Sequence, residues 1–299
     1  MMLTTDIGLI TDPEYRKYVE EFANDEKAFA EAFAAVWYKL VNRDMGPATR
    51  CVGPDVAPAQ PFQFPLPDPP AKLADFDAVE KELNKLKGGE FIRLAMQSAN
   101  TYRCTDYLGG CNGARIRFSP GKDWKTNAGL DKTLALLEPI KKRFGDSLSW
   151  ADLIVLAGNV AVKRVGAPSN TPFCPGRADA PDGAGWKPLE YGNAEFPSSV
   201  ADMVERYERR GLTAKEFVAL SFASSPSPVA CLQEILSSDG VDDVMAEGFK
   251  FNPDLRIWAE YYVSAGHEVF ANDFATAWTK LMNSDRFDGP TGNVCIVSP

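Results

Sequence analysis

Apolar residues recur at intervals of three and four along much of this chain, the spacing that places side chains on one face of an α-helix. The clearest stripe lies within residues 29–44. Its members are Phe29, Phe33, Val36, Trp37 and Leu40. Such a stripe is expected to be buried against a core. Because strand-like alternation is scarce, the sequence predicts a mainly α fold with few or no strands.

Five further segments show helical spacing. They are residues 76–87, 89–103, 127–144, 147–166 and 213–223. The fourth is apolar all round, which predicts a buried central helix that starts at Ser149, just before Asp152. Thr213 and Glu216 have the spacing of a capping box at the start of the last one.

The chain contains an internal repeat. Residues 29–44 and 270–285 are identical at nine of sixteen positions. The similarity extends upstream, where each copy carries a proline, Pro13 or Pro253, that suits a first helical turn. Each copy therefore predicts a pair of helices. The presence of two similar copies indicates duplication of a structural unit.

A proline-rich break separates the two copies. Residues 53–70 hold seven prolines in eighteen positions, a composition that blocks helices and predicts an extended linker or arm. The predicted organisation is a helix pair over residues 1–52, a linker over 53–70 and a second domain over 71–299.

Composition narrows the function classes. The net charge of −9 argues against a nucleic-acid partner or an anionic membrane surface. No apolar run is long enough to insert in a membrane, and the first residues lack the pattern of a secretory signal. We expect a soluble protein of the cytoplasm or an organelle matrix.

Cysteine and histidine usage restricts the chemistry further. The six cysteines fit no common zinc spacing, so we expect no metal site and reduced thiols, with a Cys104–Cys111 disulfide left open. His267 is the single histidine of the chain, which excludes most histidine-based catalysis.

Three motifs carry a family resemblance. They read GGCNGARIRF at 109–118, LDKTLALLEPIKKRFGDSLSWADLIVLAGNVAV at 130–162 and TPFCPGRADA at 171–180. Together they resemble the class I plant-type haem peroxidases, and above all the catalase-peroxidases, which consist of two tandem peroxidase-like domains of which the second binds no haem. Residues 71–299 resemble that second domain.

The repeat has an explanation within this resemblance. Residues 1–70 resemble the tail of the first domain, so both copies would be terminal helix pairs, one from each half of a tandem. The catalytic body of the first domain is absent from this sequence. The span from about 222 to 250 is also shorter than the matching family region.

The resemblance implies a vestigial distal pocket. A haem peroxidase uses a distal histidine as general acid–base and an arginine that stabilises developing charge. The family reads R-L-A-W-H there. This chain keeps Arg93 but has Met96 for the tryptophan and Gln97 for the histidine, while Asn127 matches the asparagine that orients the lost histidine. A glutamine amide takes no proton near neutral pH. We expect Arg93 and Asn127 to bond to backbone or to each other, and Met96 to fill space.

The proximal side is altered as well. The family's V-A-L-S-G-G-H is similar to residues 218–224, which place Ser224 at the axial position and Phe222 in place of a glycine. A serine hydroxyl is a weak iron ligand. Asp6 matches the proximal aspartate of the first domain, whose histidine is absent.

Two other groups are conceivable iron ligands. We interpret His267 as an exposed turn residue instead. We interpret Cys174 as part of a structural turn, in which Arg177 pairs with Asp179.

The resulting expectation is a haem-free pseudoperoxidase, a scaffold or interaction module with no catalytic residues, cofactor or metal, that docks on a protein partner or within a larger complex. With no local body to cover, the stripe of residues 29–44 would be the docking element. The alternative is a divergent peroxidase that binds haem b and reduces hydrogen peroxide. A third possibility is a truncated product with no selected role.

Overall fold

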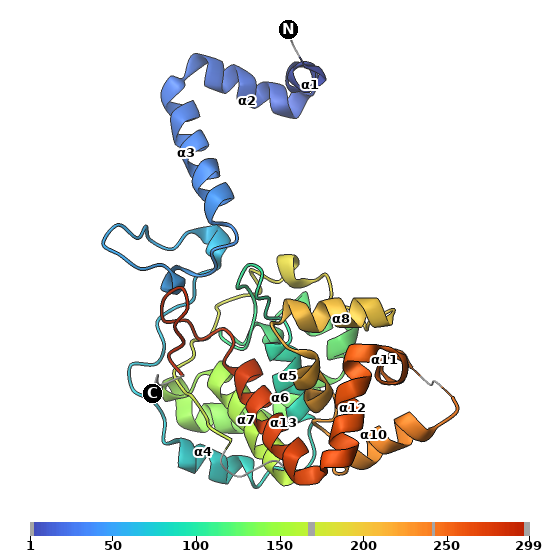
Figure 1. The fold of residues 1–299 in the computed structure, drawn as a ribbon. Helices are drawn as coiled ribbons and strands as arrows, with labels where there is room; N and C mark the ends of the chain where they lie inside the picture. Colours follow the sequence, from blue (N-terminus) through green and yellow to red (C-terminus); the bar gives the residue numbers. More distant parts are fainter. Residues whose placement is uncertain (1–2, 167–170, 241–242, 296–299) are drawn as a thin grey trace. The chain divides into compact units, whose positions relative to one another are not determined.

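The computed structural model describes residues 3–166, 171–240 and 243–295 (Figure 1). Thirteen α-helices lie within these ranges. They are α1 Thr4–Thr11, α2 Pro13–Asn24, α3 Glu26–Asn42, α4 Phe76–Leu83, α5 Phe91–Ala99, α6 Leu130–Phe144, α7 Trp150–Arg164, α8 Val200–Arg209, α9 Ala214–Leu220, α10 Pro228–Ser237, α11 Val244–Phe251, α12 Pro253–Ala265 and α13 His267–Met282.

The predicted fold class is confirmed. In the described ranges β pairing is limited to two isolated bridges, Gly113 with Asp179 and Phe287 with Asn293. No helix of the described chain is long and apolar enough to cross a membrane. The helices α1, α8, α10 and α11 were not predicted, although α8 shows the expected spacing in Val200, Met203 and Tyr207.

The chain divides into two compact units, residues 1–46 and 47–299. The first contains α1, α2 and α3, and none of these helices buries a residue. Asp12 caps α2 by accepting bonds from the amides of Glu14 and Tyr15, and Pro13 occupies its first turn as predicted. Asp6 lies in α1 and accepts a bond from the Leu3 amide at 2.8 Å.

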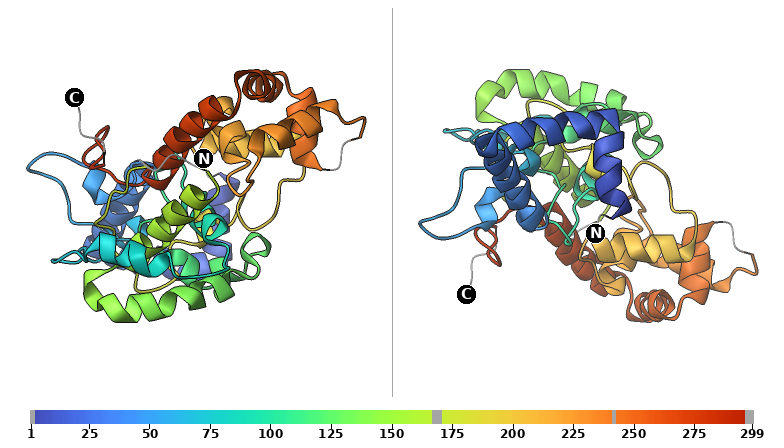
Figure 2. Two further views of the ribbon diagram at one scale, coloured as in Figure 1. Left: turned by 90° about the horizontal axis from the view of Figure 1, so that it is seen from below. Right: turned by 90° about the horizontal axis from the view of Figure 1, so that it is seen from above.

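The second unit is built around α7. Eleven of the fifteen residues of this helix are buried, and Ser149 caps it by accepting a bond from the Asp152 amide, as the sequence predicts. Viewed from below, α4 to α7 lie on one side of the unit and α10, α11 and α12 lie on the other (Figure 2). The proline-rich residues 53–70 are extended apart from the turn Pro61–Gln63, and they belong to this unit.

Close approach of α5, α7 and α13 fixes the centre of the unit. A Cβ atom at Gly158 of α7 would lie 2.6 Å from the Ala95 Cβ of α5 and 3.0 Å from the Trp278 ring of α13. Any larger residue would therefore separate these helices. This contact fixes the position of α5. It thereby also positions Met96 and Gln97, the two residues that follow Ala95.

The two copies of the repeat have opposite environments. In α13 the stripe is buried as predicted, and Trp278 is fully enclosed. In α3 the equivalent Trp37 is 55% exposed and Phe33 is 56% exposed. The prediction of core burial is therefore wrong for α3, because the first unit offers no body for the stripe to cover.

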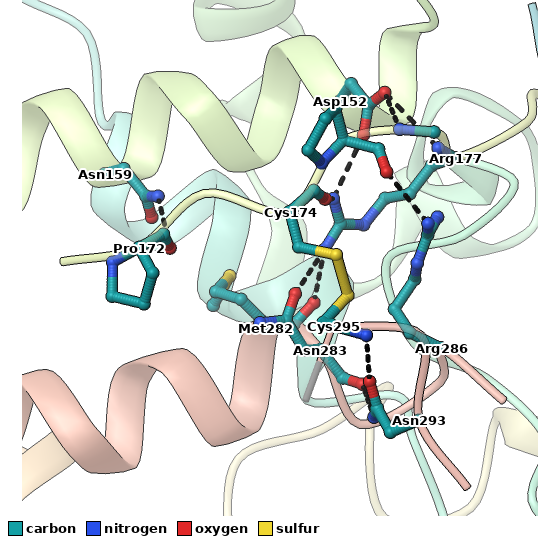
Figure 3. Close-up of a disulfide and its surroundings, with 12 residues drawn as sticks. Asp152, Asn159, Pro172, Cys174, Arg177, Met282, Asn283, Arg286, Asn293 and Cys295 are labelled. Carbon is teal, nitrogen blue, oxygen red and sulfur yellow. Dashed lines mark hydrogen bonds and ion pairs between the residues drawn. A yellow bond between two sulfur atoms is a disulfide. The ribbon is translucent and has the colours of Figure 1, made fainter. Parts of the chain in front are cut away.

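Cysteine pairing differs from the expectation of reduced thiols. Cys174 and Cys295 form a disulfide with a Cα–Cα distance of 5.6 Å (Figure 3). The remaining four cysteines, Cys104 and Cys111 among them, are free. No local pattern indicates the bridge, because Cys174 and Cys295 are 121 positions apart and meet only in the folded chain.

The predicted Arg177–Asp179 pair is wrong. Arg177 is completely buried and bonds Asp152 at 3.0 Å (Figure 3). Its second terminal nitrogen donates to the Met282 carbonyl and the Asn283 amide oxygen, both at 2.8 Å. Asp179 instead accepts bonds from the backbone amides of Trp150 and Ala151 at the start of α7.

Candidate functional site

A cavity of about 540 Å³ lies in the second unit between α5, α8 and α9. Its volume falls in the range of small-molecule sites. Met96 and Gln97 line it from α5, and Phe217 and Leu220 line it from α9. The segment 221–225, just after α9, completes that wall. The structure thus brings together the distal and proximal positions singled out in the sequence.

Gln97 occupies the distal wall. Its side chain is half-buried and makes no hydrogen bond to any described residue. Met96 beside it packs against the hydrophobic core and lines the cavity without filling it. Neither side chain is a base near neutral pH, so this wall offers no group to move a proton.

Arg93 does not line the cavity. Its guanidinium donates to the carbonyls of Thr126 and Ala128, both at 2.9 Å, and to Glu90 at 2.7 Å. The expectation that Arg93 bonds to backbone is confirmed. Because these bonds occupy the terminal nitrogens of the guanidinium, it stabilises the loop before α6 rather than a charge in the cavity.

Asn127 keeps one bond and lacks another. Its Nδ2 donates to the Gly121 carbonyl at 2.7 Å, again a backbone partner. Its Oδ1 is buried without a partner among the described residues. A buried acceptor left unpaired costs about 1–3 kcal/mol. An asparagine that orients a distal histidine would accept the histidine N–H at this oxygen. The distal position of this chain holds no histidine to donate that bond.

Ser224 lies on the proximal wall and is exposed. Two residues earlier, Phe222 lines the same cavity and packs on Phe249, with 5.7 Å between ring centroids. The predicted extra bulk is therefore present at the proximal wall, although a substantial cavity persists beside it.

His267 lies closer to this wall than the sequence suggested. It is the first residue of α13, exposed as expected, and it borders a separate small hollow that shares Phe222 and Ser225 with the cavity. It is not among the residues that line the cavity itself. Cys174 is held in its disulfide and offers no thiolate.

Sequence reasoning missed Arg210, which follows α8 and also lines the cavity. Its Nε donates to the Asn100 carbonyl at 2.9 Å. Burial, together with the neighbouring charges of Arg206 and Arg209, lowers the pKa of Arg210 to about 10. The run Glu208–Arg209–Arg210 was visible in the sequence, but only the fold shows which arginine reaches the cavity.

The cavity can be tested for a fit to haem by its donor set. Known axial ligands are imidazole, thiolate, phenolate and, alongside histidine, thioether. The side chains that line the cavity include no histidine, cysteine or tyrosine. An amide at Gln97 and a hydroxyl at Ser224 stand where the two imidazoles would be required. The residues present do not fit haem iron.

Comparison with known proteins finds one matching family and several relatives. The family model described as Peroxidase matches residues 75–231, a range that contains both Gln97 and Ser224. Over 372 aligned positions the chain is 34% identical to a catalase-peroxidase of Escherichia coli, which covers 96% of this chain and 49% of that protein. A catalase-peroxidase of Shewanella baltica strain OS185 is 36% identical over 360 positions, covering 96% of this chain and 50% of the relative. One from Geobacillus kaustophilus strain HTA426 is 34% identical over 355 positions, covering 96% and 48%. The chain spans about half the length of the curated relatives it matches.

Proposed function

Because this chain belongs to the peroxidase family and corresponds to about half of a catalase-peroxidase, we propose that it is a haem-free pseudoperoxidase that acts as a structural and docking module. The observation that carries the proposal is the cavity between α5 and α9. It measures about 540 Å³ and has Gln97 and Ser224 on its two walls.

Three features of the site each argue against peroxidase activity. Replacing a general base by a neutral amide typically costs about 10²–10⁴ in rate. A hydroxyl at Ser224 supplies no strong iron ligand. Arg93 does not line the cavity and is bonded to the carbonyls of Thr126 and Ala128. Binding and chemistry would thus both be impaired, which supports a role that needs the fold alone.

The docking element is the exposed stripe of α3. In the first unit Phe22, Phe29, Phe33 and Trp37 form a continuous row, with successive ring centroids 5.7–6.0 Å apart. The equivalent row of α13 is buried against α9 and α12. An apolar stripe of this length normally marks an interaction site.

The proposed partner is the body of a haem-bearing peroxidase domain. The support is the repeat itself, since its buried copy shows what such a stripe packs against: the helices of a peroxidase-like domain. The curated relatives are about twice as long as this chain, so their other half would supply such a body.

Catalysis is tested by steady-state oxidation of a chromogenic donor with hydrogen peroxide, using protein expressed with added hemin. The expected rate equals that of free hemin at the same concentration. Turnover in the ordinary enzyme range, about 1–10³ s⁻¹, would instead establish the alternative, a divergent peroxidase that uses haem b.

Docking is tested by cross-linking and mass spectrometry in extract of the native source. The wild-type chain is expected to cross-link through α3 to a haem-bearing peroxidase chain. Phe33→Asp with Trp37→Asp is expected to abolish the cross-link. The control Ala35→Asp places one aspartate on the opposite face of α3 and is expected to leave the cross-link intact. Equal cross-linking by all three proteins would overturn the docking role.

A further inference from the structure

The cavity between α5, α8 and α9 combines apolar walls with one cation that has no counter-ion. Among the described residues, no carboxylate lies within ion-pair distance of the Arg210 guanidinium. Its one hydrogen bond to the described chain uses Nε, so the two terminal nitrogens remain available. Neither nitrogen is sealed away from solvent.

The two neighbouring arginines each pair with a carboxylate, which makes Arg210 distinct. Arg206 binds Asp202 through two nitrogens, at 2.7 and 2.8 Å, and also donates to the carbonyls of Gly192 and Glu195. Arg209 pairs with Glu205 and bonds the Tyr191 carbonyl. Arg206 therefore has no N–H to spare, and the charge of Arg209 is already paired with that of Glu205.

Two amides line the cavity together with Arg210. The side chains of Gln97 and Asn100 make no hydrogen bond to any described residue. Each carries two N–H donors, and the Arg210 terminus adds its own, a set suited to a planar oxyanion. The acidic side chain in the lining is Glu195, which is engaged by Lys125 at 2.9 Å and largely exposed, so it lies at the mouth.

The rest of the lining is mostly apolar. Its main members are Met96, Met203, Leu212, Phe217, Leu220 and Met245. Three of these are methionines, whose flexible thioethers adapt to ligands of varied shape. A ligand that satisfies both regions must carry a negative head and an apolar body.

We propose that this cavity binds an amphipathic carboxylate of the medium-chain fatty-acid type. The carboxylate lies on the terminal nitrogens of Arg210 with the Gln97 and Asn100 amides beside it, and the alkyl tail lies among the methionine, leucine and phenylalanine side chains. The proposal rests on the haem-free role, because the tail occupies the space that a porphyrin would need.

Electrostatics favour an anion at this place. Burial and two like charges lower the pKa of Arg210 to about 10, yet the group stays cationic at neutral pH. A bound carboxylate would supply the missing opposite charge, and charge-assisted bonds of this kind are the strong ones in proteins.

Isothermal titration calorimetry with octanoate and octan-1-ol tests the proposal. Saturable 1:1 binding of octanoate is expected, at least tenfold tighter than that of the alcohol. Across hexanoate, octanoate and decanoate, affinity should rise about fourfold for each methylene buried.

Two matched variants locate the head group. Arg210→Met is expected to weaken octanoate binding about 10- to 100-fold by loss of a charge-assisted interaction. Arg209→Met removes the same charge one residue away, outside the lining, and is expected to change affinity less than threefold. Unchanged circular dichroism of both variants excludes misfolding as the cause.

The proposal is overturned if octanoate gives no saturable heat, if octan-1-ol binds as tightly, or if both arginine variants weaken binding equally. A parallel hemin titration keeps the two proposals separate. One tightly bound haem per chain would defeat the haem-free role, whereas failure of octanoate with no haem bound would defeat only the carboxylate site.

Discussion

The Trp278 indole donates a hydrogen bond to the Asn159 amide oxygen at 2.7 Å, in the fully buried contact between α13 and α7. Trp37 has the same place in the other copy of the repeat and is exposed. One sequence motif thus serves as core in one unit and as surface in the other.

Substitution at these two positions should have unequal effects. Trp278→Phe leaves the Asn159 oxygen buried without its donor, so we expect a loss of about 1–3 kcal/mol in unfolding free energy, plus the cost of any cavity. Trp37→Phe, on an exposed helix face, should change stability by less than about 0.5 kcal/mol. Urea unfolding followed by circular dichroism measures both. Equal losses would show that the α3 stripe is buried after all.

The buried pair of Arg177 and Asp152 joins α7 to the end of α13. Asp152→Ala removes the carboxylate and leaves an uncompensated buried cation, which should cost about 3–5 kcal/mol. Asp179→Ala removes amide bonds at the start of α7, with no buried ion pair among them, and should cost about 0.5–2 kcal/mol. Thermal melts that rank the two variants in the opposite order would contradict the assignment of Asp152 as the partner.

The disulfide predicts a labelling pattern. Alkylation of the denatured, non-reduced protein should modify four cysteines, and prior reduction should raise the count to six. Intact mass spectrometry reads both numbers. Reduction should also lower stability by about 2–5 kcal/mol, because the bridge closes a long loop. Six modified cysteines without reduction would show that Cys174 and Cys295 are unpaired.

Asp202 should make the stability of the fold depend on pH. Its hydrogen bond to Arg206 holds the pKa of the Asp202 carboxyl at about 2, well below the value near 3.9 expected for unfolded chain. The carboxylate therefore stabilises the fold above about pH 4, and this contribution is lost as pH falls from about 4 towards 2.

Comparison with Asp202→Asn isolates this contribution. The wild type should be the more stable protein at pH 7, with a gap that narrows once pH falls below about 4. Urea unfolding at steps from pH 7 to pH 3 provides the test. A gap that stays constant across that range would refute the role of the Asp202 charge.

Local patterns predicted the helical body well, because spacing and caps are encoded within a few residues. The capping box of Thr213 and Glu216 and the buried helix after Ser149 are examples. The resemblance also placed Gln97 and Ser224 in one pocket, and the structure brings them to one cavity.

Other features depend on contacts that no local pattern encodes. The burial of a stripe depends on what covers it, so α3 and α13 could not be told apart from their nearly identical spacing. The Cys174–Cys295 bridge and the unpaired Arg210 arise only when distant segments meet.

Under the proposed function, haem is excluded by the loss of its ligands and not by loss of space. Ser224→His should therefore gain hemin binding, because it returns an imidazole to a wall of a cavity of about 540 Å³. Ser227→His, three residues further on and outside the lining, is the matched control and should not bind. If Ser224→His binds no more hemin than the control, the bulk of Phe222 has closed the site instead.

The most direct measurement is the visible absorption spectrum of the wild-type protein purified after expression with added hemin. We predict no protein-bound Soret band and far less than one haem per chain. A stoichiometric band, retained through gel filtration, would contradict it and establish this chain as a haem protein.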